Sequence, residues 1–414
     1  MSKVVAVIPN NPVLLQNTIQ QPNILMKTHN IALVTGDGSA PEMMRAACRV
    51  ASKAANKDGG VLNFHETPAG WNAYFSLGDT LPKSSLEDMI KIGTVFFGGV
   101  GDPQHDNTIG AEHPEMKPEA RALLTLRKEM GLLLNFRPMI YYPELASLTN
   151  VKPENIPSDK IIKQIWIRFL LEDSYFGNQD FLNNPDYKVA AHAAAIGACV
   201  KSAVRGTEEL VSDIAYYRKK TIEKYIRAAF KHARELGLPL ISIDKANVMA
   251  RYDYWRKIVT RVGAEEFPDV NLTHQLVDSA NALMFTPAKL HGVIACGNEH
   301  GDILSDGAAA ALGSMGMMCS SAINPDTGAA MFESGAGTAP TIAGQDKANP
   351  LGRILTGAMM LRHLGMGNAA DSIEAAVKQV LELGYRTIDL APANQEGIKV
   401  VGTEWMGDLI MARL

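Results

Sequence analysis

The chain has 414 residues, of which 46% are hydrophobic and 20% are charged, and its formal net charge is −4. This composition predicts a soluble globular protein with two domains, and the slightly acidic balance argues against a general nucleic-acid-binding protein. The four cysteines show no CxxC or CxxH spacing, so we expect reduced core thiols in a cytoplasmic protein. Without a run of 18 apolar residues or a signal-peptide pattern, no membrane association is expected.

The first third of the chain predicts an extension followed by α/β units. Residues 1–30 are rich in Pro, Asn and Gln, and we expect an N-terminal extension that could include a strand at Val4–Ile8. From Asn30 the run IALVTGDGSAPE predicts a buried strand, a glycine turn and a helix that begins at Pro41. A second strand, Thr94–Gly98, leads into GGVGDPQHD. Because no GxGxxG follows these strands, a conventional Rossmann dinucleotide site is not expected.

Three arginines and a tyrosine stand out in the middle of the chain. The segment ARALLTLRKEMGLLLNFRP contains Arg127 and Arg137, and the predicted strand IIKQIWIRF contains Arg168. Guanidinium groups bind carboxylates through paired hydrogen bonds, so arginines directed at one pocket would hold a dicarboxylate. The alternative for the helical part is an ordinary solvated face. Tyr175 follows seven residues after Arg168, where a tyrosine is more often a packing residue than a functional one.

The stretch CGNEHGDILSDGAAAALGS, residues 296–314, predicts a metal-binding helix. An apolar run that ends at Cys296 predicts a buried strand, and the alanine-rich run after it favours a helix. The four-residue spacing of Asp302 and Asp306 places both carboxylates on one face of that helix. Two hard oxygen ligands suit Mg²⁺ or Mn²⁺. Alternatively, acidic residues near a helix N-terminus serve capping and the helix dipole alone.

These motifs resemble, in the same order, those of the β-decarboxylating dehydrogenases, the family of the 3-isopropylmalate and isocitrate dehydrogenases. GDGSAPE is similar to the family's GDGIGPE, the arginine segment to LxxLRKxxxLxxNLRP, and RFLLEDSYFG to RExTGGxYFG or RENxEDxYxG. DKANV resembles DKANVL, and GNEHGDILSD resembles the metal-binding signature GNxxGDILSD. ESGAGTAPTIAGQDKANP resembles the cofactor loop ExxHGTAPxxAGxxxANP. The resemblance covers about residues 30–414.

The resemblance implies an α/β protein with the isopropylmalate/isocitrate dehydrogenase-like fold. In that fold two domains flank an active-site cleft, and the dinucleotide site is not of the Rossmann type. The expected large domain comprises residues 31–132 and 313–414, and the expected small domain comprises residues 133–312. The resemblance also implies a homodimer or larger homo-oligomer, with an exchanged arm and an interface helix within residues 178–238. We expect that helix at Thr221–Leu236, with an apolar face of Ile222, Tyr225, Ile226 and Ala229.

The resemblance assigns roles to individual residues. Lys245 would accept the proton of the substrate's hydroxyl group, and Tyr175 would donate a proton to carbon. The substrate-binding residues would be Arg127, Arg137 and Arg168, with Leu123 and Leu124 beside the C3 substituent. The metal ligands would be Asp278, Asp302 and Asp306. The cofactor-binding residues would be Asn298, Glu333, Gly337, Thr338, Ala339, Thr341 and Asn349.

The activity implied is NAD- and Mg²⁺- or Mn²⁺-dependent oxidative decarboxylation of a C3-substituted malate, such as 3-isopropylmalate, to a 2-oxo acid and CO2. Ala336 stands where the family has a histidine, and Thr341 stands where NAD enzymes have Asp and bacterial NADP enzymes have Lys. Because no basic residue is found at that position, NAD is expected rather than NADP. Isocitrate, homoisocitrate, tartrate or arylmethylmalate chemistry on the same scaffold, or a binding homologue without cofactor, are the alternatives.

Overall fold

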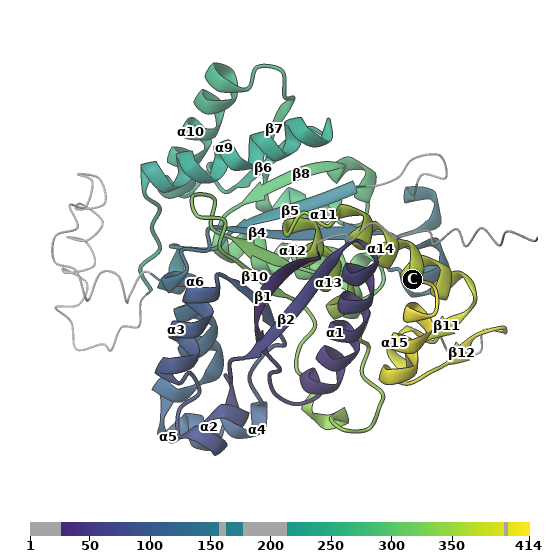
Figure 1. Cartoon of the computed structure of the whole chain (residues 1–414). Helices are drawn as coiled ribbons and strands as arrows, with labels where there is room; N and C mark the ends of the chain where they lie inside the picture. Colours follow the sequence, from purple (N-terminus) through teal and green to yellow (C-terminus); the bar gives the residue numbers. More distant parts are fainter. Residues whose placement is uncertain (1–25, 157–162, 177–212, 393–395) are drawn as a thin grey trace, which may run out of the picture.

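A ten-stranded sheet forms the centre of the computed structural model, which describes residues 26–156, 163–176, 213–392 and 396–414 (Figure 1). The strand expected at Val4–Ile8 and most of the expected arm lie outside these residues. Across the sheet the strands are β2 (Gly60–Glu66), β1 (Lys27–Val34), β3 (Thr94–Phe97), β10 (Ala330–Glu333), β9 (Ser321–Ile323), β4 (Leu134–Ile140), β5 (Lys163–Phe169), β8 (Gly292–Cys296), β6 (Leu240–Asp244) and β7 (Leu272–Leu276).

The strands are parallel at both ends of the sheet and antiparallel in its middle. β9 is antiparallel to both β10 and β4, and β4 is antiparallel to β5, whereas the other neighbouring pairs are parallel. Parallel neighbours require crossover connections, which explains the helices between the terminal strands. The antiparallel middle joins residues from the first and last thirds of the chain to the central part.

Helices cover the sheet and extend beyond its ends (Figure 1). The helices of the first third are α1 (Ala40–Lys57), α2 (Trp71–Leu77), α3 (Lys83–Ile92), α4 (Pro103–Asp106), α5 (Ile109–Glu112), the π-helix η2 (Glu119–Leu124) and α6 (Thr125–Glu129). The helices of the middle are α9 (Lys219–Leu236), α10 (Ala250–Glu266), α11 (Val277–Leu283) and α12 (Asn298–Leu312). The last quarter contributes α13 (Leu351–His363), α14 (Gly367–Glu382) and α15 (Thr403–Met411), with a small two-stranded sheet of β11 (Tyr385–Arg386) and β12 (Lys399–Val400).

The buried apolar residues fall into separate clusters on the two halves of the sheet. One cluster joins α1 to α13, α14 and α15, and another joins β1, β3 and α3 to α6. On the other half, α9 and α10 pack over β6 and β8, and α12 packs over β5 and β8. The domain boundaries expected from the sequence stay a prediction, because one sheet runs through both halves.

Several local expectations are confirmed. The structure is of the α/β class, β1 and β3 lie where strands were expected, and α1 begins beside Pro41. The apolar face expected on the Thr221–Leu236 segment is fully buried in α9. Among the described cysteines, Cys296 and Cys319 are buried and free, whereas Cys48 is only half-buried. No helix of the described ranges is long and apolar enough to span a membrane; the cytoplasmic location stays a prediction.

Candidate active site

Arg137 and Arg168 lie on neighbouring strands and point to the same face of the sheet. Asn135 of β4 is directly opposite Arg168 of β5, and directly paired residues of two strands share a face. Arg137 lies two positions along β4 from Asn135, so strand alternation places it on that face too. Both arginines are buried, with 7% and 1% of their surface exposed. The antiparallel pairing of β4 and β5 therefore brings two cations from separate sequence motifs side by side.

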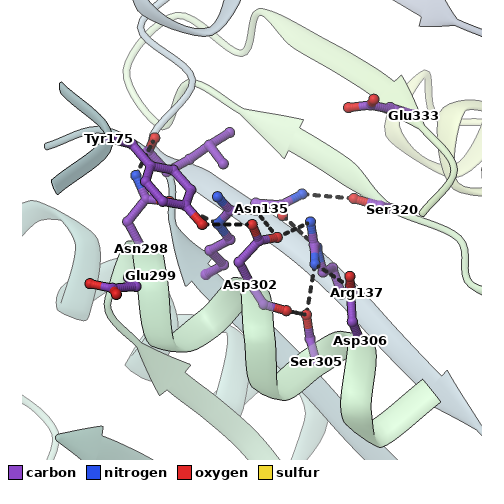
Figure 2. A network of polar contacts seen from close by, with 12 residues as sticks. Asn135, Arg137, Tyr175, Asn298, Glu299, Asp302, Ser305, Asp306, Ser320 and Glu333 are labelled. Atoms are coloured by element: carbon purple, nitrogen blue, oxygen red, sulfur yellow. Dashed lines mark hydrogen bonds and ion pairs between the residues drawn. The ribbon is translucent and has the colours of Figure 1, made fainter. Parts of the chain in front are cut away.

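Helix α12 places two carboxylates over these arginines. Arg168 Nη1 donates to Asp302 Oδ1, and Arg137 Nη2 lies 3.1 Å from the same oxygen. Arg137 Nη1 donates to Asp306 Oδ1 at 2.9 Å, so the two aspartates share this arginine (Figure 2). The close approach needs Gly301, because a Cβ there would lie 2.9 Å from the Cβ of Arg168. The predicted pairing of two carboxylates on one helical face is therefore present.

Two polar side chains orient Arg137. Its Nε donates to Asn135 Oδ1 at 2.8 Å, and its Nη1 donates to Ser305 Oγ at 2.7 Å (Figure 2). Asn135 is held in turn by Ser320 Oγ, to which its Nδ2 donates at 2.7 Å. Asn135 and Ser305 were not among the expected site residues, and their positions inside the NFRP and ILSD motifs are the signal that could have found them.

The two carboxylates have opposite pKa shifts although they are one helical turn apart. Burial opposes ionisation of Asp302, but the charges of Arg168 and Arg137 outweigh burial and hold its pKa below the usual value. For Asp306 burial dominates over the attraction of Arg137, and its pKa is raised. Burial and repulsion by Arg137 lower the pKa of Arg168 to about 9, which leaves it charged at neutral pH. Asp302 is therefore the firmly anionic member of the pair.

Tyr175 contacts the second oxygen of Asp302. Its hydroxyl donates to Asp302 Oδ2 at 3.0 Å (Figure 2), and the guanidinium carbon of Arg168 lies 5.3 Å from the centre of its ring. Burial and the negative charge of Asp302 raise the pKa of Tyr175 to about 12. The phenol is therefore protonated at neutral pH, as a proton donor must be. The structure brings Tyr175 into the cluster instead of leaving it as a packing residue.

The turn between β5 and Tyr175 is held by two buried acids in left-handed conformation. Glu172 and Asp173 have φ angles of 69° and 64°, and 1% or less of each is exposed. Non-glycine residues rarely adopt this conformation, and the surrounding contacts must stabilise it. Glu172 accepts hydrogen bonds from the backbone and side chain of Arg218. Asp173 accepts from Tyr217 Oη and from the backbone N–H of Glu299, which ties the turn to α12.

Arg127, the third expected arginine, pairs with another acid. Its Nη2 lies 3.3 Å from Glu333 Oε2, and 7% of the residue is exposed. Glu119 of η2 interacts electrostatically with this pair and with Asp302, and burial followed by repulsion from Asp106 raises its pKa. Sequence reasoning missed Glu119, although it opens the helix that carries the arginine motif. Arg127 is thus linked to the other two arginines through shared acids.

The apolar pair Leu123 and Leu124 is half-buried in η2. Leu123 packs against the core cluster that contains Leu126, so its side chain is partly committed to the fold. A pocket for the substrate's C3 substituent therefore does not follow from this pair alone.

Lys245 and Asp278 form a separate pair. Lys245 Nζ lies 2.5 Å from Asp278 Oδ1, at the ends of β6 and β7. Lys245 follows β6, two strands from β5, and Asp278 begins α11 after β7. Among the described residues, neither side chain forms a hydrogen bond or ion pair with Arg168, Asp302 or Asp306. The described ranges contain no group of three His, Cys, Asp or Glu side chains that could hold a metal ion. The three expected metal ligands are therefore not assembled within one chain, and only Asp302 and Asp306 come together.

The donor chemistry of Asp302 and Asp306 fits two ligands of a divalent cation. Both are carboxylates on one helical face, and 30% and 40% of their side-chain surface is exposed. Hard oxygen donors of this kind suit Mg²⁺ and Mn²⁺.

The expected cofactor loop at residues 337–339 is tied to the first turn of the fold. Ser39 donates from its N–H and from Oγ to Thr338 O, both at 2.8 Å, and Thr338 Oγ1 donates to Gly101 O at 2.8 Å. Gly337 is exposed, and Ala339 has a φ of 39°. Within the described part of the chain, no hydrogen bond uses the backbone N–H groups of residues 337–339. Free N–H groups on a turn of this kind suit an anionic group such as a diphosphate.

Thr341 and Asn349, two further expected cofactor residues, both form hydrogen bonds within the chain. Thr341 is exposed, and its carbonyl accepts from Gln345 Nε2 at 2.9 Å. Asn349 is buried at the start of α13, where Oδ1 accepts from Leu351 N and Nδ2 donates to Asp389 Oδ2.

Asn298 has a role that the sequence motif did not reveal. It is fully buried, and its Oδ1 accepts from Arg168 Nε at 2.8 Å. Its Nδ2 donates to the carbonyls of Leu170 and Glu172, both at 3.1 Å. The amide therefore has no free donor for a cofactor in this structure, and it orients Arg168 instead.

Comparisons with known proteins identify the family of the chain. A family model for isocitrate/isopropylmalate dehydrogenase matches residues 30–410. The chain belongs to this family. Relatives named 3-isopropylmalate dehydrogenase include one from Oleidesulfovibrio alaskensis, which is 37% identical over 93% of this chain and 99% of its own length. Another from Bordetella parapertussis is 38% identical over 94% and 99%, respectively.

Solved structures with the same fold include two dehydrogenases. Isocitrate dehydrogenase from Methylococcus capsulatus is 27% identical, with a TM-score of 0.73 and coverage of 93% of this chain and 99% of that chain. A β-decarboxylating dehydrogenase from Thermococcus kodakarensis is 27% identical, with a TM-score of 0.68 and coverage of 93% and 96%. The resemblance and the fold expected from the sequence are confirmed, and the chain is a decarboxylating dehydrogenase of the oxidoreductase class.

Proposed function

We propose that this family member oxidatively decarboxylates a C3-substituted malate of the 3-isopropylmalate kind, with NAD and Mg²⁺ or Mn²⁺, to a 2-oxo acid and CO2. The observation that carries the proposal is the contact cluster of Arg137, Arg168, Asp302 and Tyr175. It combines two cations for carboxylate binding, an anionic metal ligand and a protonated phenol. The relatives named 3-isopropylmalate dehydrogenase, at 37–38% identity, support the substrate class.

Substrate binding would exchange partners among the charges of the free protein. Asp302 now balances both Arg137 and Arg168, so one carboxylate serves two guanidinium groups. The carboxylates of the substrate would take over these arginines, and Arg127 would add a third cation. Asp302 would then be free to act as a metal ligand together with Asp306. This exchange explains why a dicarboxylate, with its two negative charges, suits the site.

Proton transfers fall to Tyr175 and Lys245. Tyr175 would protonate the carbon that loses CO2, a step for which its raised pKa keeps the proton available. Lys245, as a neutral amine, would accept the proton of the C2 hydroxyl group, and Asp278 would hold the ammonium group that this transfer forms. When bound, a divalent cation would polarise the C2 oxygen and NAD would accept the hydride.

We propose further that the active unit is a homodimer in which a second subunit supplies Lys245 and Asp278. The support is that, among the described residues, Asp278 forms an ion pair with Lys245 and no metal-binding group with Asp302 and Asp306.

NAD is the proposed dinucleotide. Thr341 carries no positive charge for a 2′-phosphate, and the ammonium group of Lys347 is bonded to Gln345 Oε1 at 2.9 Å. Arg353, another basic residue in this loop region, is fully buried and cannot reach an exposed phosphate.

Isocitrate-type chemistry is the second candidate, favoured by the similarity to the isocitrate dehydrogenase structure. A substrate screen separates the two. Purified protein with NAD and Mn²⁺ is supplied with malates that differ at C3, including 3-isopropylmalate, isocitrate, homoisocitrate and tartrate, and NADH formation is read by absorbance. The highest kcat/KM is expected for an apolar branched substituent. Preference for isocitrate would move the assignment to the other branch, and no NADH with any substrate would contradict the proposal.

A further inference from the structure

A buried cation without an acidic contact lies beneath the candidate cofactor loop. Arg353 of α13 has 1% of its surface exposed. Its Nε and Nη2 donate to Gly98 O, and a weaker contact joins Nη2 to Ala336 O at 3.4 Å. Its Nη1 lies 3.4 Å from Met43 Sδ. All these acceptors are uncharged.

The charge of Arg353 is not balanced nearby. Burial lowers its pKa to about 10, so the guanidinium is charged at neutral pH. The acid that acts on it electrostatically is Glu333, which is already paired with Arg127 at 3.3 Å. Burying a charge without a counter-ion destabilises a fold, so a structure that keeps one usually uses it. A negatively charged ligand near Arg353 would supply the missing counter-charge.

The guanidinium lies beside the start of this loop, with Nη2 3.4 Å from Ala336 O. A Cβ added at Gly99 would lie 3.2 Å from Arg353 Nη2 and 3.9 Å from Thr338 Cγ2. Gly99, which is itself buried, therefore lies next to both the cation and the side chain of Thr338. A Cβ added at Gly337 would meet nothing within 4 Å, and the N–H groups of residues 337–339 are free of hydrogen bonds in the described chain. The positive charge thus adjoins the loop whose N–H groups are free among the described residues.

We propose that Arg353 is the internal counter-charge for the diphosphate of the dinucleotide, acting through the backbone of Gly99 and the residue 337–339 loop without touching the ligand's surface. The proposal rests on the proposed function, in which this loop binds NAD. This counter-charge would also make up for the polar groups that the family uses for the adenosine end and that Ala336 and Thr341 lack. Because a buried charge is screened little by solvent, it retains an effect on a nearby anion.

The test compares ligands that differ in charge. Adenosine, AMP and ADP are titrated by calorimetry, without metal, into the wild type, Arg353→Gln and Arg353→Lys. Glutamine keeps an N–H donor for Gly98 O without the charge, whereas lysine keeps the charge. Arg386→Gln is the matched control, because Arg386 is also buried and also donates to backbone carbonyls, those of Leu381, Tyr385 and Glu144. Thermal melting checks that each variant is folded.

Arg353→Gln is expected to weaken ADP binding about tenfold and to leave adenosine binding unchanged, with AMP between them. Arg353→Lys should stay near the wild type, and Arg386→Gln should not change the ratio of ADP to adenosine affinity. An equal loss for adenosine and ADP, or no loss for ADP, would overturn the proposal. If the Arg353 variants do not fold, the wild type decides: similar affinities for ADP and adenosine refute a counter-charge, and a strong preference for ADP supports it. Failure of the proposed function is distinguishable, because then the wild type itself would bind neither NAD nor ADP.

Discussion

Asp302 serves the fold and the chemistry with the same carboxylate. It accepts from Arg168, lies 3.1 Å from Arg137 and accepts from the hydroxyl of Tyr175. Asp302→Asn is expected to abolish turnover and to remove thermal stabilisation by Mn²⁺. It should also lower the free energy of unfolding without metal by about 3 kcal/mol, because buried Arg168 loses its counter-charge and Arg137 keeps only Asp306. Urea unfolding with and without Mn²⁺ measures both effects.

Asp306→Asn is the matched control for Asp302. Asp306 contacts only Arg137 among the two arginines, is more exposed, and has a raised pKa, so its loss should cost about 1 kcal/mol or less without metal. Metal-dependent stabilisation should be lost in both variants.

The stabilisation by Asp302 should depend on pH. Its folded-state pKa is depressed, so its contribution to folding stability is present above the usual carboxyl pKa and is lost as pH falls through the lower value. The stability difference between wild type and Asp302→Asn should therefore shrink below about pH 4. Wild-type turnover in Asp302→Asn would refute the assignment.

Tyr175 separates decarboxylation from hydride transfer. Tyr175→Phe removes the proton donor and its hydrogen bond to Asp302 but keeps the ring beside Arg168. CO2 release is expected to slow by about 10²- to 10⁴-fold, which is typical of a lost general acid. The variant should still reduce the 2-oxo intermediate when NADH is supplied. Unimpaired CO2 release would remove Tyr175 from the mechanism.

Thr341 tests the choice of dinucleotide at a single exposed position. Thr341→Asp is expected to tighten NAD binding, because a carboxylate can accept hydrogen bonds from ribose hydroxyls, and to exclude NADP through charge repulsion. A gain of about 0.5–1.5 kcal/mol, the value of an ordinary hydrogen bond, is expected for NAD. Calorimetric titration of both dinucleotides measures it. Tighter NADP than NAD in the wild type would contradict the proposed cofactor.

At the scale of elements, α12 depends on other parts of the chain for its N-terminal cap. Its N-cap residue, Gly297, has no side chain to accept a hydrogen bond. Tyr217 Oη accepts from the N–H of Asn298, and Asp173 accepts from the N–H of Glu299. The turn that leads to Tyr175 and the helix that carries Asp302 are thereby fixed relative to each other.

Tyr217→Phe should loosen this connection. It removes the acceptor for α12 and leaves the carboxylate of Asp173, which is fully buried, without the Tyr217 hydroxyl. We expect a loss of about 1–3 kcal/mol in unfolding free energy and a reduced kcat. Tyr254→Phe, at an exposed position of α10, is the control and should change neither. Equal stability of the two variants would show that the cap contributes little.

At the scale of the whole molecule, the proposed dimer and a site built within one chain predict different activities for mixed variants. Tyr175→Phe and Lys245→Met homodimers should both be nearly inactive. A mixed dimer has one subunit of each variant. One of its sites then carries both substitutions, whereas the other site pairs an unchanged Tyr175 with an unchanged Lys245 and is intact. Mixing and refolding the two variants should therefore restore up to about half the activity per mixed dimer. If both residues act within one chain, every site carries one substitution and no activity returns.

The sequence by itself determined the family, the elements and the local faces. The four-residue spacing placed Asp302 and Asp306 on one side of α12, and the periodicity of α9 identified the residues that are buried there. These features depend on backbone geometry over a few residues, which the order of residue types reveals. The ordered motifs likewise identified the arginines and Tyr175 before any contact was known.

The tertiary structure alone decided how these residues share charge. The order of the strands in the sheet brings Arg137 beside Arg168, whereas the strands that precede Lys245 and Asp278 lie on the other side of β8. The same packing turned Asn298, an expected cofactor contact, toward Arg168, and it buried Arg353 beside Gly99. Burial and charge act through space and decay with distance, not with separation along the chain. Asp302 and Asp306 are four residues apart on one helix, but their surroundings differ. Their pKa values are therefore shifted in opposite directions.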